Sequence, residues 1–318
     1  MSKKATERGK DMDSKRTRNI TRGLFYKIFW YALLIGLAFI ILYPFIVKLS
    51  SMFMSMADTY DDTVALIPKN PTLDNIIYVF RNTPLTKAYF NTCFNSLLCA
   101  VLSTVTAVSV GYGLAKFNFI GKRILLAVVL LSLLIPFSTI MVPTYMYFRY
   151  FDFFGIIRLI TGSSVSTVNT PFPLWFLAFA GFGFRGGLYI LIIRQAFCGL
   201  PKELDEAGMV DGANYFRLFI NINVPLVRSM AFVVFILSFA WQWTDSLYNN
   251  LLLPTYEHFP RVLTLISAKN ETSLGSGTYV VSILSNTALL LIIIPLLVVF
   301  VISQKQLVQG IERAGLVG

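Results

Sequence analysis

Residues 200–225 read LPKELDEAGMVDGANYFRLFININVP, a charged and helix-favouring stretch in a chain that is otherwise largely apolar. Pro201 suits the first position of a helix, where its missing N–H would be unpaired anyway, and acidic residues follow at the end that the helix dipole favours. Gly212 can take a left-handed conformation that ends this helix. Residues 213–221 then predict a second short helix running up to Pro225. The stretch is therefore predicted as a helix-turn-helix on a membrane surface.

The composition predicts an integral membrane protein. The 318 residues are 56% hydrophobic and 14% charged, against about 25% charged in a typical soluble domain. The charges cluster and leave uncharged runs of the roughly twenty residues that cross about 30 Å of hydrocarbon. Lipid cannot satisfy backbone polar groups, and the runs are too long and uniform for barrel strands, so the predicted fold is all-α.

The apolar runs predict six transmembrane helices. They lie at about 24–47, 90–115, 124–148, 171–198, 225–253 and 278–303. The chain accordingly divides into a basic tail at 1–23, a first transmembrane helix at 24–48, an extracytoplasmic loop at 49–89, a transmembrane core at 90–303 that includes the loop 200–224, and a tail at 304–318. Pro136 and Pro143 predict kinks in the third span.

The distribution of Lys and Arg predicts the orientation. The side that carries the N-terminus holds sixteen of these residues, and the opposite side holds eight over much longer loops. By the positive-inside rule, both termini and the loop 200–224 are expected in the cytoplasm. The net charge of +11 is explained by this bias and predicts contact with anionic lipid through the basic tail, without a nucleic-acid partner.

Cysteine and histidine usage predicts neither a disulfide framework nor a metal site. The three cysteines lie in or beside hydrophobic segments and form no CxxC pair, and His258 is the single histidine. No GxxxxGK[ST] motif occurs, so the chain is not expected to bind ATP by a P-loop. Paired carboxylates and a Ser/His/Asp set are also missing from the pattern, so an enzyme is not predicted.

The charged stretch carries a family resemblance. Glu206-Ala207-Gly208, then Gly212, then Ile222-Asn223-Val224-Pro225 resembles the EAA motif of ABC importer permeases, E-A-A-x3-G-x9-I-x-L-P, with Gly208 in place of the second Ala and Val224 in place of Leu. In that family the loop is a coupling helix that sits in a groove of a separate ATPase subunit. The resemblance implies a set of coupling residues: Glu203, Glu206, Ala207, Gly208, Asp211, Gly212 and Ala213. The alternative is an ordinary charged loop between two transmembrane helices.

The resemblance extends over most of residues 90–318. The runs 95–122, 136–143, 194–204 and 304–310 are similar to carbohydrate importer permeases of the maltose type. This implies a six-helix permease in the cell membrane that pairs with a homologous second permease, two ATP-binding subunits and an extracellular solute-binding protein, with ATP and Mg held by the partner subunits. The long basic tail and Gly208 depart from the common pattern.

Residues 238–248 provide a candidate solute site. On one continuous helix Ser238, Trp241, Asp245 and Tyr248 would share a face. The aromatic rings could stack on a sugar, and the carboxylate and hydroxyls could bond its hydroxyl groups. Such a polar stripe should face a protein interior or a wet cavity. The alternative is an aromatic belt at the outer interface, with Asp245 held by a neighbouring helix.

Two further polar residues belong to this candidate site. Asn95 lies near the outer end of the second span. Arg185 is nominally mid-span, but its setting, GFGFRGG at 181–187, indicates an interrupted helix. The favoured interpretation places the regular helix after Arg185 and leaves its side chain in a wet vestibule.

The sequence thus predicts the permease subunit of an ATP-driven importer of sugars or oligosaccharides that works by alternating access. One alternative is a permease of the same class for a non-sugar solute. The other is a self-contained secondary transporter, which would need ion-coupling residues and usually an internal repeat, and neither is visible.

Overall fold

A computed structural model describes residues 2–64, 66–183, 185–273 and 278–315. Within this range the regular elements are helices, with one isolated bridge between Phe151 and Val165. The predicted all-α fold is therefore confirmed. Met1, residues 274–277 of the predicted third external loop and residues 316–318 of the C-terminal tail lie outside the described residues.

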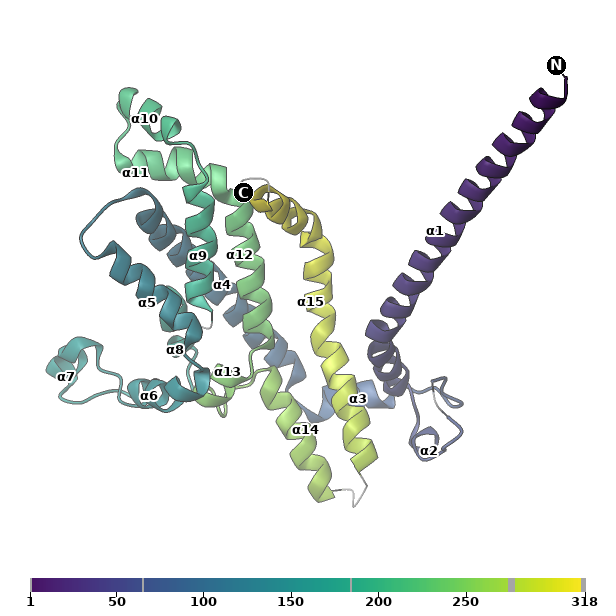
Figure 1. Cartoon of the computed structure of the whole chain (residues 1–318). Coiled ribbons are helices and arrows are strands. Elements are labelled where there is room, and N and C mark those ends of the chain that lie inside the picture. Colours follow the sequence, from purple (N-terminus) through teal and green to yellow (C-terminus); the bar gives the residue numbers. More distant parts are fainter. Residues whose placement is uncertain (1, 65, 184, 274–277, 316–318) are drawn as a thin grey trace.

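The elements follow one another along the chain as shown in Figure 1. The first half contains α1 (Ser2–Met52), α2 (Met56–Thr59), α3 (Asp74–Asn82), α4 (Leu85–Lys116), α5 (Lys122–Leu134), α6 (Phe137–Arg149), the 3-10 turn η1 (Phe153–Gly155) and α7 (Ile156–Thr161). The second half contains α8 (Phe172–Phe179), α9 (Gly186–Cys198), α10 (Lys202–Val210), α11 (Tyr215–Arg217), the π-helical turn η2 (Leu218–Asn223), α12 (Val224–Thr244), α13 (Leu247–Leu252), α14 (Phe259–Ser273) and α15 (Thr278–Gly315).

Helix α4 is the central element of the bundle. It packs against α8, α9 and α12, and α12 packs in turn against α15. Small residues permit the close approach, since a Cβ at Gly111 would lie 3.0 Å from the backbone N of Arg194 and 3.0 Å from Cγ2 of Ile193. Small-residue contacts of this kind are typical of helix pairs in membranes, where lipid offers no hydrophobic drive for association.

Helix α1 stands apart from this bundle. Its apolar part, Tyr26–Met52, is long enough to cross a membrane and is largely exposed in the isolated chain, with Ser51 and Met52 buried at its end. No break separates it from the predicted tail at 1–23, because the helix is continuous from Ser2. It joins the body through α15, where Lys48 Nζ donates a hydrogen bond of 2.8 Å to Asn286 Oδ1. Figure 1 shows the rest of α1 leaning away from the body.

The predicted third span is not one kinked helix. Helices α5 and α6 are bent by 105° at a break around Pro136. Ile135 is extended, as the residue before a proline prefers, and Pro136 is the N-cap of α6. The proline thus turns the chain instead of bending a continuing helix.

Within the part of the chain that the structure describes, four helices are long and apolar enough to span a membrane, or five if α5 and α6 count as one broken span. The predicted fourth span is divided between α8 and α9, and α9 has only 13 residues. The count of six spans therefore stays a prediction. In Figure 1, α10 and α11 lie at the same end of the molecule as the N-terminal end of α1 and the C-terminal end of α15. This arrangement agrees with the predicted topology, in which these segments share one side.

The segment between α1 and α3 is organised by buried Asp58. Its Oδ2 accepts a 2.9 Å hydrogen bond from the backbone N–H of Asn70, and its Oδ1 accepts one of 3.0 Å from Asn70 Nδ2. Ser55 caps α2 by accepting from the Asp58 N–H. The predicted loop at 49–89 is thus an ordered segment, and the second span begins at Leu85, before the predicted residue 90.

Acidification is expected to loosen this segment. Hydrogen bonds, first of all from the Asn70 backbone N–H, hold the pKa of Asp58 below its ordinary value of 3.8. The folded state therefore favours the carboxylate, and its stabilising contribution is full above pH 3.8 and is lost as the pH falls below it toward the folded pKa. Hydrogen exchange of residues 53–73 should rise between pH 7 and pH 3 after correction for intrinsic rates.

Asp58→Asn should raise the exchange of residues 53–73 already at pH 7. The matched control is Asp62→Asn, which neutralises an exposed carboxylate of the same segment. Equal exchange in the two variants would remove Asp58 as the anchor of this segment.

Candidate functional site

The charged stretch folds as a helical projection, defined here as residues 202–223. Helix α10 begins at Lys202, directly after Pro201, with Glu203 and Asp205 in its first turn. It ends at Val210, and Gly212, which follows the C-cap Asp211, has a φ of +79°. The Ala213 N–H donates to Gly208 O and the Gly212 N–H donates to Met209 O, both at 3.0 Å. These are the two hydrogen bonds of a Schellman motif, so the predicted turn at Gly212 is confirmed.

The second half of the projection continues into the membrane helix. Asn214 caps α11 by accepting a 2.8 Å hydrogen bond from the Arg217 N–H. The predicted stop at Pro225 is wrong, because η2 runs directly into α12 and Pro225 lies in the first turn of α12. The π-helical turn already interrupts the regular hydrogen-bond ladder there, so the missing N–H of proline is tolerated.

The predicted coupling residues divide by exposure. Glu203, Glu206, Ala207, Asp211 and Gly212 are exposed, and Ala213 is half-buried. Gly208 is buried instead, because a Cβ there would lie 2.4 Å from Leu218 Cδ2 and 2.9 Å from Ile222 Cδ1. Gly208 thus packs α10 against η2 and is not part of the outer surface.

The projection also exposes apolar side chains that the sequence analysis missed. Val210, Tyr215 and Phe216 are 88%, 62% and 73% exposed, and together they form the apolar tip of the projection. Exposed apolar groups beside acidic ones on a short element mark an interaction surface. The signal was present in the sequence, since these residues flank the Gly212 turn outside any apolar run.

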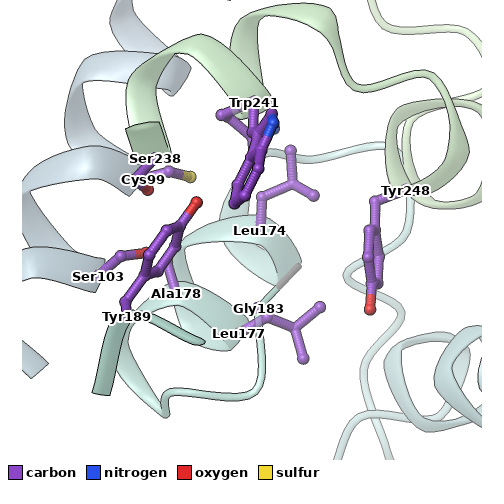
Figure 2. A pocket seen from close by; sticks show the side chains of 11 residues that line it. Cys99, Ser103, Leu174, Leu177, Ala178, Gly183, Tyr189, Ser238, Trp241 and Tyr248 are labelled. Carbon is purple, nitrogen blue, oxygen red and sulfur yellow. The ribbon is translucent and has the colours of Figure 1, made fainter. Parts of the chain in front are cut away.

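A narrow cavity lies between α4, α8, α9, α12 and α13. Ser238, Trp241 and Tyr248 line it, together with Ser103 and Tyr189 (Figure 2). The Tyr189 hydroxyl points toward Ser238 in Figure 2. The cavity volume that the centre of a water molecule can reach is about 20 Å³. This is room for about one water molecule. The cavity must therefore widen before a sugar can enter.

Arg185 lies where the chain passes from α8 to α9. It has a φ of +67°, is the N-cap of α9 and is exposed, so the predicted interruption of the helix is confirmed. Its guanidinium carbon is 3.9 Å from the centre of the Trp241 ring, a cation–π contact. The Tyr189 ring is 5.9 Å from the Trp241 ring. The structure thus brings Arg185 to the predicted aromatic group, although Arg185 does not line the cavity itself.

The predicted shared face of Ser238, Trp241, Asp245 and Tyr248 is wrong, because α12 ends at Thr244. Asp245 is buried, and its carboxylate accepts hydrogen bonds from the N–H groups of residues 247, 248 and 249 at 3.0–3.4 Å. It therefore holds the first turn of α13. The alternative interpretation placed Asp245 against a neighbouring helix of the bundle. This part of it is also incorrect, since Asp245 is held by α13, the helix that follows it in the chain.

Asn95 is buried in α4, and its Oδ1 accepts a 3.1 Å hydrogen bond from Trp175 Nε1 of α8. It does not line the cavity. This bond ties α4 to α8 beside the cavity, which is a packing role in the conformation described.

The family described as binding-protein-dependent transport system inner membrane component matches residues 104–313. The chain belongs to this family. The match includes the whole projection and the residues of α8, α9, α12 and α13 that line the cavity, and it begins just after the lining residues Cys99 and Ser103 of α4.

Relatives of this transport component cover nearly its whole length. An arabinooligosaccharides transport system permease protein from Halalkalibacterium halodurans is 26% identical over 285 residues, which are 89% of this chain and 93% of the relative. A maltodextrin transport system permease protein from Streptococcus pneumoniae is 26% identical over 304 residues, 95% and 97% of the two chains.

A solved structure has a similar fold. It is a bacterial ABC transporter involved in the import of the acidic polysaccharide alginate, and one of its chains matches with a TM-score of 0.68 at 21% identity. The match covers 88% of this chain and 96% of that chain. At this identity the comparison supports the fold of the transport component alone.

Proposed function

We propose that the chain is the permease subunit of an ATP-driven importer of sugars or oligosaccharides, placed in the cell membrane with both termini in the cytoplasm. The observation that carries the proposal is the helical projection, which combines the EAA-like residues Glu206 and Gly212 with an exposed apolar tip. The oligosaccharides named for the two relatives support the solute class.

The projection is the part of the permease that contacts the ATP-binding subunit. Glu203 and Glu206 precede the exposed Val210 by seven and four residues on α10, so these three side chains share one helix face. Asp211 and Phe216 are also exposed, and the projection thus presents apolar side chains among acidic ones. Protein interfaces commonly have this anatomy. It fits a groove in an ATP-binding subunit that holds ATP and Mg, and two such subunits would act on this chain and on a homologous second permease.

The solute would pass through the cavity beside Trp241. In the conformation described, Arg185 occupies one face of the indole and Tyr189 lies near it. An incoming sugar ring would therefore have to displace Arg185 or bind at the ring edge, next to Ser238 and Tyr248. An extracellular solute-binding protein would deliver the sugar, and widening of the cavity would accompany the switch between inward- and outward-open states.

Reconstitution of the complex tests this function. The permease, its partner permease, the ATP-binding subunits and the solute-binding protein are placed in liposomes, and ATP hydrolysis is measured with and without maltodextrin or arabinooligosaccharide. Saccharide-dependent stimulation of hydrolysis is the expected result. Uptake by the permease alone, driven by an ion gradient, would instead establish the secondary-transporter alternative.

Phe216→Glu should weaken the association of the permease with its ATP-binding subunit by about tenfold or more, because it places a charge in the apolar tip of the projection. The effect is measured by copurification and by the dissociation constant of the permease for the isolated ATP-binding subunit. Phe154→Glu is the matched control, since Phe154 is also highly exposed and lies in η1, directly before α7, which Figure 1 shows at the opposite end of the molecule from α10. Equal binding by the two variants would exclude the apolar tip from the interface.

A further inference from the structure

Asp205 links its own helix α10 to η2 within the projection and to the distant end of α4. Its Oδ2 lies 2.7 Å from Nζ of Lys116, the last residue of α4. Its Oδ1 accepts a 2.7 Å hydrogen bond from Nδ2 of Asn223, the last residue of η2. Both carboxylate oxygens are thereby used. These three residues are called the clamp below.

The clamp is shielded from water. The side chains of Lys116 and Asp205 are only 13% and 18% exposed, and Asn223 is 1% exposed. Asp205 lies in the first turn of α10 and Lys116 in the last turn of α4, so each charge also lies at the helix end whose dipole favours it. Removing one partner of such a pair leaves the other charge poorly compensated, which costs far more than the loss of a surface ion pair.

Aromatic packing strengthens the same junction. The ring of Tyr112, one turn before Lys116 on α4, lies 4.7 Å from that of Phe219 in η2 and 5.3 Å from that of Phe197 in α9. Phe117, which follows Lys116, lies 5.6 Å from Tyr215 of the apolar tip. The base of the projection is thus packed against the end of α4 as well as linked by the chain to α9 and α12.

Helix α4 leads from the clamp to the cavity. Cys99 and Ser103 of α4 line the cavity, and Lys116 lies 13 residues beyond Ser103 on the same helix. An α-helix rises 1.5 Å per residue, so the two points are about 20 Å apart along a continuous rod. A displacement of α10 that α4 follows would therefore reach the cavity wall directly.

We propose that Asp205 is a positioning residue, and that the clamp of Asp205, Lys116 and Asn223 fixes the projection to α4 so that movement of the ATP-binding subunit is transmitted to the cavity through α4. The inference builds on the proposed function and names a route for its coupling. Without the clamp, α10 keeps the packing of Gly208 against η2, and the aromatic contacts of Tyr112 and Phe117 still touch the projection, but α10 loses its polar link to α4 and follows it less closely.

Neutralising one member of the clamp tests the route. In the reconstituted complex, Asp205→Asn and Lys116→Gln should each lower the amount of saccharide transported per ATP hydrolysed by about tenfold, because one buried charge is left unpaired and the joint loosens. The double variant should be no worse than either single variant, since the residues act as a unit. Arg123→Gln, which removes an exposed cation of the neighbouring cytoplasmic turn, is the control and should transport as the unsubstituted protein does.

The charge-reversed pair Lys116→Asp with Asp205→Lys covers the case in which the single variants fail to assemble. It should restore assembly and coupling at least in part, because Asn223 can rotate its amide and accept from the new lysine. Wild-type coupling in both single variants, a double variant whose loss equals the product of the single losses, or a charge reversal without any rescue would each overturn the clamp.

Thermal melting of the purified complex separates this inference from the proposed function. Asp205→Asn and Lys116→Gln should each lower the melting temperature by roughly 5 °C, and the two effects should not add. A wild-type complex without saccharide-stimulated ATP hydrolysis would refute the importer assignment, whereas additive melting shifts would refute the clamp alone.

Discussion

Gly212→Val is expected to lower the saccharide-stimulated rate of ATP hydrolysis by about tenfold or more. Gly212 has a φ of +79° and closes the Schellman motif that sets the direction of α11 against α10. The left-handed conformation costs a residue with a side chain roughly 1–2 kcal/mol, and a β-branched residue is among the least tolerant. A new Cβ would meet nothing within 4 Å, so the cost is conformational and not steric.

Gly212→Asn is the matched control. Asparagine, like valine, adds a side chain at this position, but asparagine tolerates the left-handed region. It should therefore keep most of the coupling that valine loses, and circular dichroism and copurification should show that both variants remain folded and membrane-inserted. Equal damage from asparagine and valine would mean that the outer surface at Gly212, and not the turn, is what matters.

Local signals explain which parts of the fold could be predicted from the sequence. Gly212 and the GFGFRGG run at 181–187 predict helix breaks, because glycine readily adopts a positive φ. Both breaks are present in the structure. The long apolar runs likewise predict membrane helices, because period and length are properties of the run itself. Each of these inferences depends on neighbouring residues only.

The end of α12 was missed because the apolar pattern continues past it. Residues 247–253 still contain four leucines, and the break before them is marked by Asp245, a residue type that caps helices and accepts from backbone N–H groups. The preference of a residue before proline for extended backbone could similarly have announced the turn at Pro136. In both cases the backbone preference of one residue locates the helix end, and the hydropathy of the segment does not.

The clamp could not be predicted by any local rule. Lys116 and Asp205 are 89 positions apart, and each has an ordinary local explanation, as a cytoplasmic cation and as an acid in the first turn of a helix. Their contact follows from the packing of α4 against α9, which depends on the whole core. Three-dimensional structure is therefore what separates Asp205 from the exposed acids Glu203 and Glu206.

The second large effect is expected for Gly186→Ala, which should disrupt the turn between α8 and α9. An added Cβ would lie 2.3 Å from Gly181 O and 2.8 Å from Gly181 C, and these backbone atoms cannot swing away as a side chain could. Gly181 itself has a φ of +74°, so the turn has little freedom to adjust. The turn must open, and Arg185, the preceding residue, must leave its position 3.9 Å from the Trp241 ring.

Overpacking of this kind typically costs about 1–3 kcal/mol, so the melting temperature of the purified complex should fall by roughly 5 °C. Saccharide transport should fall more strongly than this loss of stability explains, because the turn borders the cavity through Gly183. The matched control is Gly113→Ala on α4, where a Cβ would meet nothing within 4 Å. If Gly186→Ala transports as well as Gly113→Ala does, the α8–α9 turn can move without consequence, and the cavity beside Trp241 is not the path of the solute.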